Sequence, residues 1–122
     1  MEFLPTPILG AYIVKNAIFQ DDRGFFKEIF RKNLVEGILS SSNFVQENHS
    51  RSKRNVLRGM HYQNRKPQGQ LVTVFSGKIY EAIVDLRPSS LSFKQTFEIT
   101  LSSLGSFNQI YTPPGVAGGF LV

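Results

Sequence analysis

Short segments rich in β-branched and aromatic residues occur along the whole chain, separated by glycine, proline, asparagine and serine. This spacing is typical of all-β sandwiches and barrels, in which turns join many short strands. Only residues 32–39, "KNLVEGIL", have helical character, and that segment is short. The predicted strands are residues 11–18, 25–30, 44–48, 71–75, 79–86, 93–101 and 109–112. We therefore expect an all-β sandwich or barrel with at most one short helix.

The chain has 122 residues, a common size for one domain, and it shows no internal repeat or linker. It contains no cysteine, which excludes disulfides and thiolate chemistry. The N-terminal residues lack the basic region and long apolar core of a signal peptide. No apolar run approaches the ~20 residues of a membrane helix. We expect a soluble, cytoplasmic protein with a single domain over residues 1–122.

The net charge of +5, from 14 Lys and Arg against 9 Asp and Glu, favours anionic partners. Nucleic acid is one candidate, and a phosphorylated or nucleotide-linked small molecule is another. The positive charge gathers at Arg51, Lys53, Arg54 and Arg58, and again at Arg65 and Lys66. A solvated loop explains residues 51–54, taken alone, about as well as a binding site does.

Residues 71–75 and 79–86 are separated only by Ser76, Gly77 and Lys78, which predicts a tight hairpin. Because strand side chains alternate, one face of the second strand carries Tyr80, Ala82, Val84 and Leu86. The other face carries Ile79, Glu81, Ile83, Asp85 and Arg87. This partly charged face is either exposed to solvent or lines a polar cavity.

Two further segments carry candidate site residues. In "VLRGMHYQ", strict alternation places Arg58 and His61 on opposite faces, but a bulge at Gly59 turns both to the same side. In "FVQENHS", Gln46, Asn48 and Ser50 share one face of a predicted strand, which suggests polar ligand contacts. On spacing alone, an edge strand with its polar side in water explains these three residues better.

Five segments together resemble the cupin-fold family of nucleotide-sugar epimerases whose type member is dTDP-4-dehydrorhamnose 3,5-epimerase, of which this chain looks like a short member. They are "DDRGFFKEIF", "FVQENHSRSKRNVLRGMHYQ", "GQLVTVFSGKIYEAIVDLRPSS", "TFEITLSS" and "IYTPPGVAGGF". They occur in family order from residue 21 to the C-terminus. The resemblance implies a cupin-like jelly-roll β-barrel or sandwich.

The resemblance also implies an activity. The family removes a proton beside the ketone of a nucleotide-diphospho-4-keto-6-deoxy sugar and returns it to the opposite face of the carbon. Such chemistry needs a base at the C–H bond and stabilisation of the enolate oxygen. The keto group supplies the acidity, so no metal or other cofactor is implied. The partners implied are the nucleotide sugar and a second copy of the chain, with neither nucleic acid nor a membrane.

Residue roles follow from the matched positions. His61 corresponds to the catalytic base, a role that suits a histidine because imidazole exchanges its proton near neutral pH. Arg58 corresponds to a residue near the sugar and diphosphate. The other substrate-binding positions are Gln46, Glu47 and Asn48, and, contributed by the partner subunit, Arg23, Phe26 and Glu28.

The chain departs from the family pattern at two positions. Gln70 stands where the family has a lysine that stabilises the enolate, which favours weaker catalysis, with Arg58 taking part of the task. Gly118, in "AGGF", replaces a histidine, and we expect this change to leave Asp85 without its partner. The family's general-acid tyrosine and its base-orienting aspartate match no residue up to Val122. Asp85 and Glu81 are the alternatives for orienting His61.

We therefore expect a sugar-nucleotide epimerase that acts at C3 alone, or a 3,5-epimerase, in deoxysugar or O-antigen lipopolysaccharide biosynthesis. The alternatives are a 3,4-ketoisomerase on the same substrate class and a catalytically weakened nucleotide-sugar-binding protein. The presence of only two histidines, His49 and His61, disfavours a metal-dependent cupin.

Overall fold

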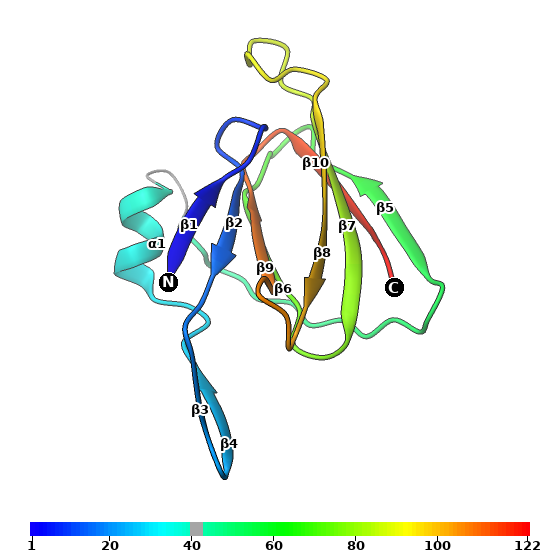
Figure 1. The fold of residues 1–122 in the computed structure, drawn as a ribbon. Helices are drawn as coiled ribbons and strands as arrows, with labels where there is room; N and C mark the ends of the chain where they lie inside the picture. Colours follow the sequence, from blue (N-terminus) through cyan, green and yellow to red (C-terminus); the bar gives the residue numbers. More distant parts are fainter. Residues whose placement is uncertain (40–42) are drawn as a thin grey trace.

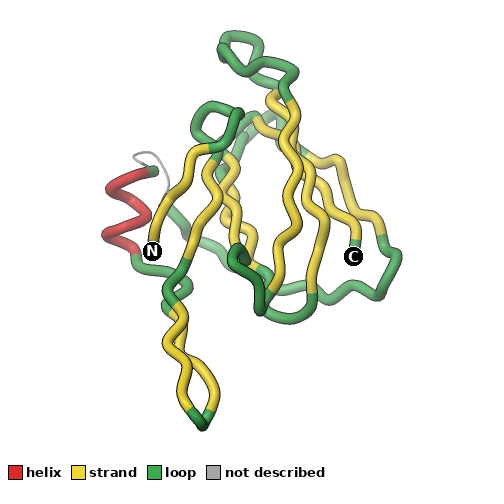
Figure 2. Tube along the Cα trace, viewed as in Figure 1, coloured by secondary structure: helices red, strands yellow, loops and turns green. Residues whose placement is uncertain are grey.

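The computed structural model describes residues 1–39 and 43–122, and these residues fold mostly into strands (Figures 1 and 2). The only helix within these ranges is α1, Lys32–Ile38. The strands are β1 Glu2–Pro5, β2 Tyr12–Lys15, β3 Ile18–Asp21, β4 Gly24–Lys27, β5 Leu57–His61, β6 Gln70–Thr73, β7 Lys78–Asp85, β8 Thr96–Ser102, β9 Gln109–Thr112 and β10 Val116–Leu121. The predicted all-β class with one short helix is confirmed.

Two four-stranded antiparallel sheets pack face to face (Figure 1). The first sheet has the order β1-β2-β9-β6, and the second has the order β5-β10-β7-β8. Among the described strands no ladder joins the two sheets, so they form a sandwich that does not close into a barrel. The core between them includes Ile110 from the first sheet and Ile83 and Leu101 from the second.

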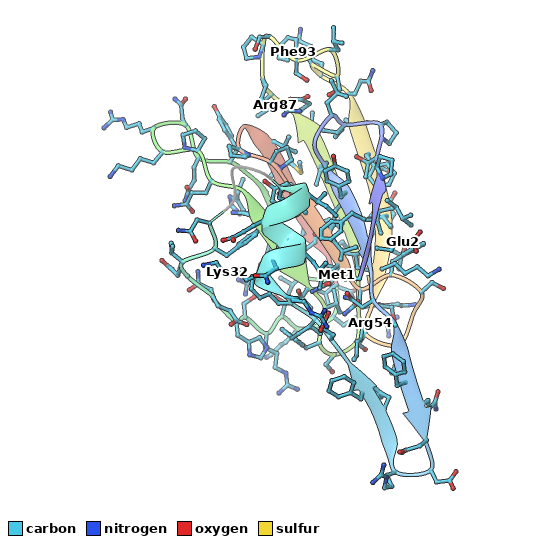
Figure 3. All side chains as sticks on the ribbon, turned by 90° about the vertical axis from the view of Figure 1, so that its left-hand side faces the viewer. Met1, Glu2, Lys32, Arg54, Arg87 and Phe93 are labelled. Carbon is cyan, nitrogen blue, oxygen red and sulfur yellow. The ribbon has the colours of Figure 1, made fainter. Side chains whose placement is uncertain are left out.

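Helix α1 covers the outer face of the first sheet. Val35 and Leu39, one helical turn apart, are both buried and pack with Tyr111 of β9. Figure 3, in which Lys32 marks the start of the helix, shows α1 lying alongside this sheet. The sheet is therefore covered on both faces, by the second sheet and by α1.

Strands β3 and β4 form a hairpin that projects away from the two sheets (Figure 1), here called the arm, residues 18–27. The predicted strand over residues 11–18 therefore ends early, at Lys15, and the arm begins at Ile18. Buried Gln109 of β9 holds the base of the arm. Its amide nitrogen donates to the Ile29 carbonyl at 2.8 Å, and its amide oxygen accepts a hydrogen bond from Asn16.

Two local predictions are wrong. β6 and β7 do not form a hairpin, because β6 pairs with β9 in the first sheet and β7 pairs with β8 and β10 in the second. Directly after β6, the Val74 amide donates to the Asn108 carbonyl at 2.8 Å, so the chain still follows the first sheet there. Residues 44–48 lie outside any sheet.

Candidate functional site

A bulge in β5 brings Arg58 and His61 to one face of the second sheet. Phe120 pairs with Arg58 and Gly118 with His61, so two residues of β5 lie opposite one residue of β10. Directly opposed residues point to the same side of an antiparallel sheet. Arg58 and His61 therefore share the face of Gly118 and Phe120, as the glycine in the sequence predicted. On β7 this same face carries Glu81 and core residue Ile83.

Glycine is required where the bulge meets β10. Gly59 has a φ of +110°, and a Cβ atom there would lie 2.5 Å from the Gly119 Cα. A Cβ atom on Gly119 would lie 2.9 Å from the carbonyl oxygen of Arg58. The two backbones approach so closely that neither position has room for a side chain. This contact fixes the positions of Arg58 and His61 on β5.

Gln70 begins β6 in the opposite sheet. It alternates in phase with Val72, which packs against the core between the sheets, so Gln70 lies on the inner face. Its pairing partner on β9 is Thr112. The inner face of the first sheet thus presents a neutral amide and a hydroxyl, and the inner face of the second sheet presents Arg58 and His61.

Glu81 is the buried carboxyl of this face. It is 3% exposed, and its Oε2 atom has no hydrogen-bond partner among the described residues. Burial raises the pKa of Glu81 to about 7, because the charged form loses water without gaining a partner. A Cβ atom at Gly118 would lie 3.2 Å from Glu81 Oε1, so the glutamate side chain reaches over the glycine of the neighbouring strand.

Asp85, on the same strand face, has a different environment. The side chains of Arg87, Ser90 and Ser92 donate hydrogen bonds to its carboxylate, with Arg87 Nε at 2.8 Å and both serine hydroxyls at 2.6 Å. The Arg87 guanidinium, with help from the two serines, holds the pKa of Asp85 well below its usual range. Figure 3 shows Arg87 and Phe93 at the same end of the molecule, where this loop lies.

The expectation that Gly118 leaves Asp85 without a partner is therefore wrong. Gly118 pairs with Ile83 on β7 and with His61 on β5, whereas Asp85 pairs with Val116 and is bound by its own loop. Asp85 is fully buried, so its strand face lies in the interior and not in solvent. The catalytic assignment of Asp85 stays a prediction.

The arm carries the residues assigned to the partner's site. At its tip, Arg23 donates to Asp21 through its backbone amide at 2.9 Å and through its guanidinium at 2.6 Å. Phe26 packs against Phe19 with ring centroids 6.4 Å apart, yet both rings are more than 60% exposed. Beyond β4, Glu28 forms an ion pair with Arg31. The arm thus presents exposed aromatic rings and a cation away from the body of its own chain.

The segment before β5 holds the remaining substrate-binding candidates. The Gln46 side-chain amide donates to Asn48 at 3.2 Å, and both residues are exposed, as is Glu47. The predicted strand that placed Gln46, Asn48 and Ser50 on one face is absent, so their common direction rests on no ladder. His49 lies against Phe75, with ring centroids 6.1 Å apart.

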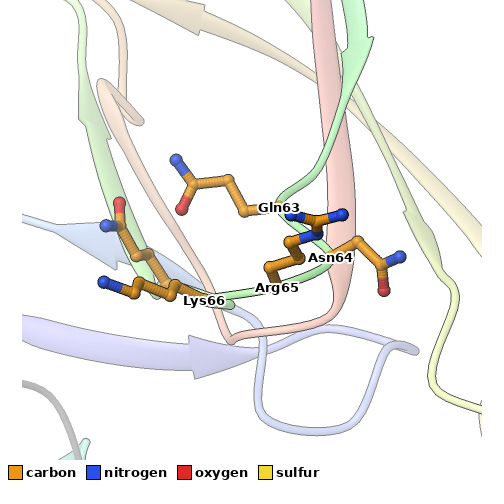
Figure 4. A pocket seen from close by; sticks show the side chains of 5 residues that line it. Gln63, Asn64, Arg65 and Lys66 are labelled. Carbon is orange, nitrogen blue, oxygen red and sulfur yellow. The ribbon is translucent and has the colours of Figure 1, made fainter.

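A hollow lies on the loop that follows His61, lined by Gln63, Asn64, Arg65, Lys66 and Gln68. Figure 4 shows these side chains pointing in different directions rather than toward one another. Two of the six clustered basic residues line it, which makes the loop a cationic edge of the site.

Residues 1–39 and 43–122 contain neither a metal-binding cluster nor a membrane-spanning helix. No three His, Cys, Asp or Glu side chains in these ranges are grouped so that they could hold a metal ion. No helix there has the length and apolar character needed to cross a lipid bilayer.

Comparison with known proteins identifies relatives of the chain. The sequence model of the family "dTDP-4-dehydrorhamnose 3,5-epimerase" matches residues 5–122. The enzyme of that name from Escherichia coli is 42% identical over 124 aligned residues, which cover all of this chain and 66% of the relative. The Neisseria gonorrhoeae enzyme is 39% identical and has 37% of its length covered. The chain thus spans between about one third and two thirds of these relatives.

Solved structures agree with this result. The crystal structure of a dTDP-6-deoxy-D-glucose-3,5-epimerase from Legionella pneumophila, in complex with dTDP-4-keto-L-rhamnose, superposes with a TM-score of 0.92 at 39% identity and covers 99% of this chain and 64% of that one. A 3'-monoepimerase from Streptomyces bikiniensis, in complex with dTDP-quinovose, gives a TM-score of 0.86 at 27% identity, over 96% of this chain and 60% of that one. These likenesses confirm the cupin-like β fold. The chain belongs to the dTDP-4-dehydrorhamnose 3,5-epimerase family.

Proposed function

We propose that this chain carries an epimerase site for a dTDP-4-keto-6-deoxy sugar, with His61 as the base. The observation that carries the proposal is the bulge at Gly59, which sets His61 beside Arg58 on the inner face of the second sheet. His61 takes the proton from the carbon beside the ketone, and the C–H electrons form the enolate. A proton from water then adds to the opposite face of that carbon, and the hydroxide left behind takes the proton from His61, which restores the base.

The charges around His61 suit this substrate. Arg58 shares its sheet face, and the loop after His61 presents Arg65 and Lys66. A guanidinium binds phosphate oxygens in a planar fork, which fits a diphosphate. The positive net charge then has a small-molecule explanation, and a nucleotide sugar is the anion that the family relationship favours.

The proposal includes a restriction to C3. Gln70 lies on the inner face where a cation would stabilise the enolate, and an amide donates a hydrogen bond without cancelling the charge. A site with less stabilisation is better suited to one proton exchange than to two. A 3'-monoepimerase that is 27% identical to this chain has the same fold, so the fold itself is compatible with the restriction.

Solvent isotope exchange tests both parts. The protein is incubated in D₂O with a dTDP-4-keto-6-deoxy sugar, and NMR follows deuterium at each carbon. We expect deuterium at C3 and not at C5, and we expect His61→Asn to abolish the exchange while His49→Asn keeps it. Exchange at neither carbon would refute the epimerase proposal, and binding without exchange would identify a binding protein. Exchange at both carbons would refute only the restriction to C3.

We also propose that the protein acts as a homodimer in which the arm reaches the partner's site. The exposed Phe19 and Phe26 rings support this, because apolar rings on a projecting hairpin are better covered than left in water. Arg23 at the tip would then supply a phosphate contact to the other subunit, together with Phe26 and Glu28.

Mixed dimers test the exchange of arms. Arg23→Ala and His61→Asn chains are each inactive in this proposal, but a dimer of the two contains one site with both native residues. Mixing and refolding them together restores activity if the arm crosses between subunits. No restoration, with mixed dimers shown to form, would place the arm at its own subunit's site.

A further inference from the structure

Glu81 is a buried acid with an unpaired side-chain oxygen. Its residue exposure is 3%, and Oε2 is buried without a partner in the described structure. Leaving such an oxygen unpaired costs about 1–3 kcal/mol, so an unsatisfied buried carboxyl calls for an explanation. Asp85 lies on the same face of β7, at the end of the strand. Its carboxylate oxygens, unlike Oε2 of Glu81, accept hydrogen bonds from Arg87, Ser90 and Ser92.

The direction of the Glu81 side chain supplies that explanation. Its Oε1 atom lies 3.2 Å from the position that a Gly118 Cβ would take. Gly118 is the pairing partner of His61, and the Cβ positions of directly opposed residues lie about 4.5–5.5 Å apart. Because Gly118 has no side chain, nothing on β10 separates the carboxyl from the imidazole.

The other neighbours of Glu81 do not compete for it. On β8 its pairing partner is Ile99, and on β10 its partner is Phe120. Arg58 lies beyond Phe120 on β5, and the inner face of the opposite sheet carries Gln70 and Thr112, which do not titrate in the neutral range. His61 is therefore the titratable group on β5 that no side chain of β10 separates from Glu81.

We propose that Glu81 is a positioning residue for His61, and that its carboxylate accepts a hydrogen bond from the His61 ring, across Gly118, when the imidazole takes up the substrate proton. The proposal rests on the proposed function in so far as His61 is the base. A carboxylate in this place fixes the ring orientation and stabilises the imidazolium, as in other base–carboxylate pairs. Its proton affinity near neutrality lets the charge on Glu81 respond to the charge on His61.

Titration of Glu81 itself tests the contact without any substrate. The side-chain carboxyl is followed by ¹³C NMR in the wild type, in His61→Asn and in His49→Asn. Loss of a hydrogen-bond donor disfavours the charged carboxylate, so we expect the pKa of Glu81 to rise by about one unit in His61→Asn. We expect no change in His49→Asn, because His49 lies against Phe75. An equal Glu81 titration in all three proteins, or an equal shift in both variants, would overturn the proposal.

Kinetics provide the second measurement. Glu81→Gln keeps the shape but loses the charge, and we expect kcat to fall about 10²-fold with little change in KM, as for other misplaced catalytic groups. Gly118→Ala should lower kcat in the same way, because its Cβ displaces the carboxyl. Glu98→Gln is the matched control, since Glu98 lies on β8 and accepts a hydrogen bond from exposed Tyr80.

The two proposals fail in different ways. A wild-type protein that exchanges no deuterium would refute the epimerase function, while the NMR titration would still decide whether Glu81 and His61 interact. An active enzyme in which Glu81→Gln keeps the wild-type kcat would refute the positioning role alone.

Discussion

His61, Gln70 and Glu81, on two sheets, are the three side chains to which our proposals assign the chemistry of the site. His61 on β5 is the proposed base, Gln70 lies on the inner face of β6, and the Glu81 side chain reaches over Gly118. A backbone bulge positions His61 and burial raises the pKa of Glu81, so different physical causes set the properties of the two groups. Gln70 is the weakest of the three, because an amide cannot neutralise an enolate.

Gln70→Lys should therefore accelerate deuterium exchange. A cation on the inner face stabilises the enolate oxygen more than an amide does, and one such group is worth about 10²-fold in rate. The measurement is the exchange rate at C3 at saturating substrate. Gln68→Lys is the control, because it adds the same charge on the exposed loop. Equal rates in Gln70→Lys and the wild type would show that residue 70 does not contact the enolate.

The sequence alone predicts part of this arrangement of side chains. The glycine in "VLRGMH" correctly predicts that Arg58 and His61 share a face. Alternation also places Glu81 and Asp85 together, but it cannot tell which carboxyl is free. That difference comes from a serine-containing loop that folds back onto Asp85 and from the pairing of Gly118 with His61. Neither contact is visible before the strands are paired.

Among the elements, the bulge of β5 is the one on which the site depends most. It forms because Gly59 and Gly119 have no side chains, so the backbones of β5 and β10 can approach each other closely. Strand β10 therefore carries two glycines in its centre, and their low strand propensity explains why the sequence does not predict β10.

Gly59→Ala should unfold more easily than Gly77→Ala. Both glycines have positive φ, so both substitutions cost about 1–2 kcal/mol of backbone strain. Only the Cβ at residue 59 also meets backbone, at 2.5 Å, whereas nothing lies within 4 Å at residue 77. We expect a total loss of about 3–5 kcal/mol for Gly59→Ala in denaturant unfolding. Equal losses in the two variants would show that β5 can move away from β10.

Other elements show where local sequence suffices and where it does not. The strand over residues 79–86 alternates clearly and matches β7 closely, and residues 109–112 match β9. Residues 76–78 predict a tight hairpin turn, but the two strands that they connect pair with distant strands. Residues 44–48 have strand-like composition without a ladder to join. Pairing between distant segments decided these cases.

For the whole molecule, burial of Glu81 makes stability depend on pH. The folded state holds the Glu81 proton up to a pKa of about 7, against the ordinary value of 4.5. Folded protein therefore binds more protons than unfolded protein between these values, and the free energy of unfolding contributed by Glu81 falls as the pH rises through this range. The full difference amounts to about 3 kcal/mol.

Glu81→Gln should remove this dependence. Urea unfolding from pH 5 to pH 8 measures it, and we expect the stability of the variant relative to the wild type to increase with pH. Arg87 keeps the pKa of Asp85 low, so Asp85 affects stability only at more acidic pH. Parallel stability curves for Glu81→Gln and the wild type would show that burial does not raise the pKa of Glu81 in the folded protein.

The hydrogen bonds of Gln109 determine where the sequence of this molecule can change without disturbing its sheets. One buried side chain binds both ends of the arm, at Asn16 and at the Ile29 carbonyl, and it also donates to Thr73 in the neighbouring strand. Residues 17–26, between those ends, are exposed, and the hairpin makes no ladder with either sheet. Insertions, deletions and new side chains in that hairpin can therefore accumulate without altering the register of β2 or β9. Surface recognition and chemistry can thus evolve at separate rates within one short chain.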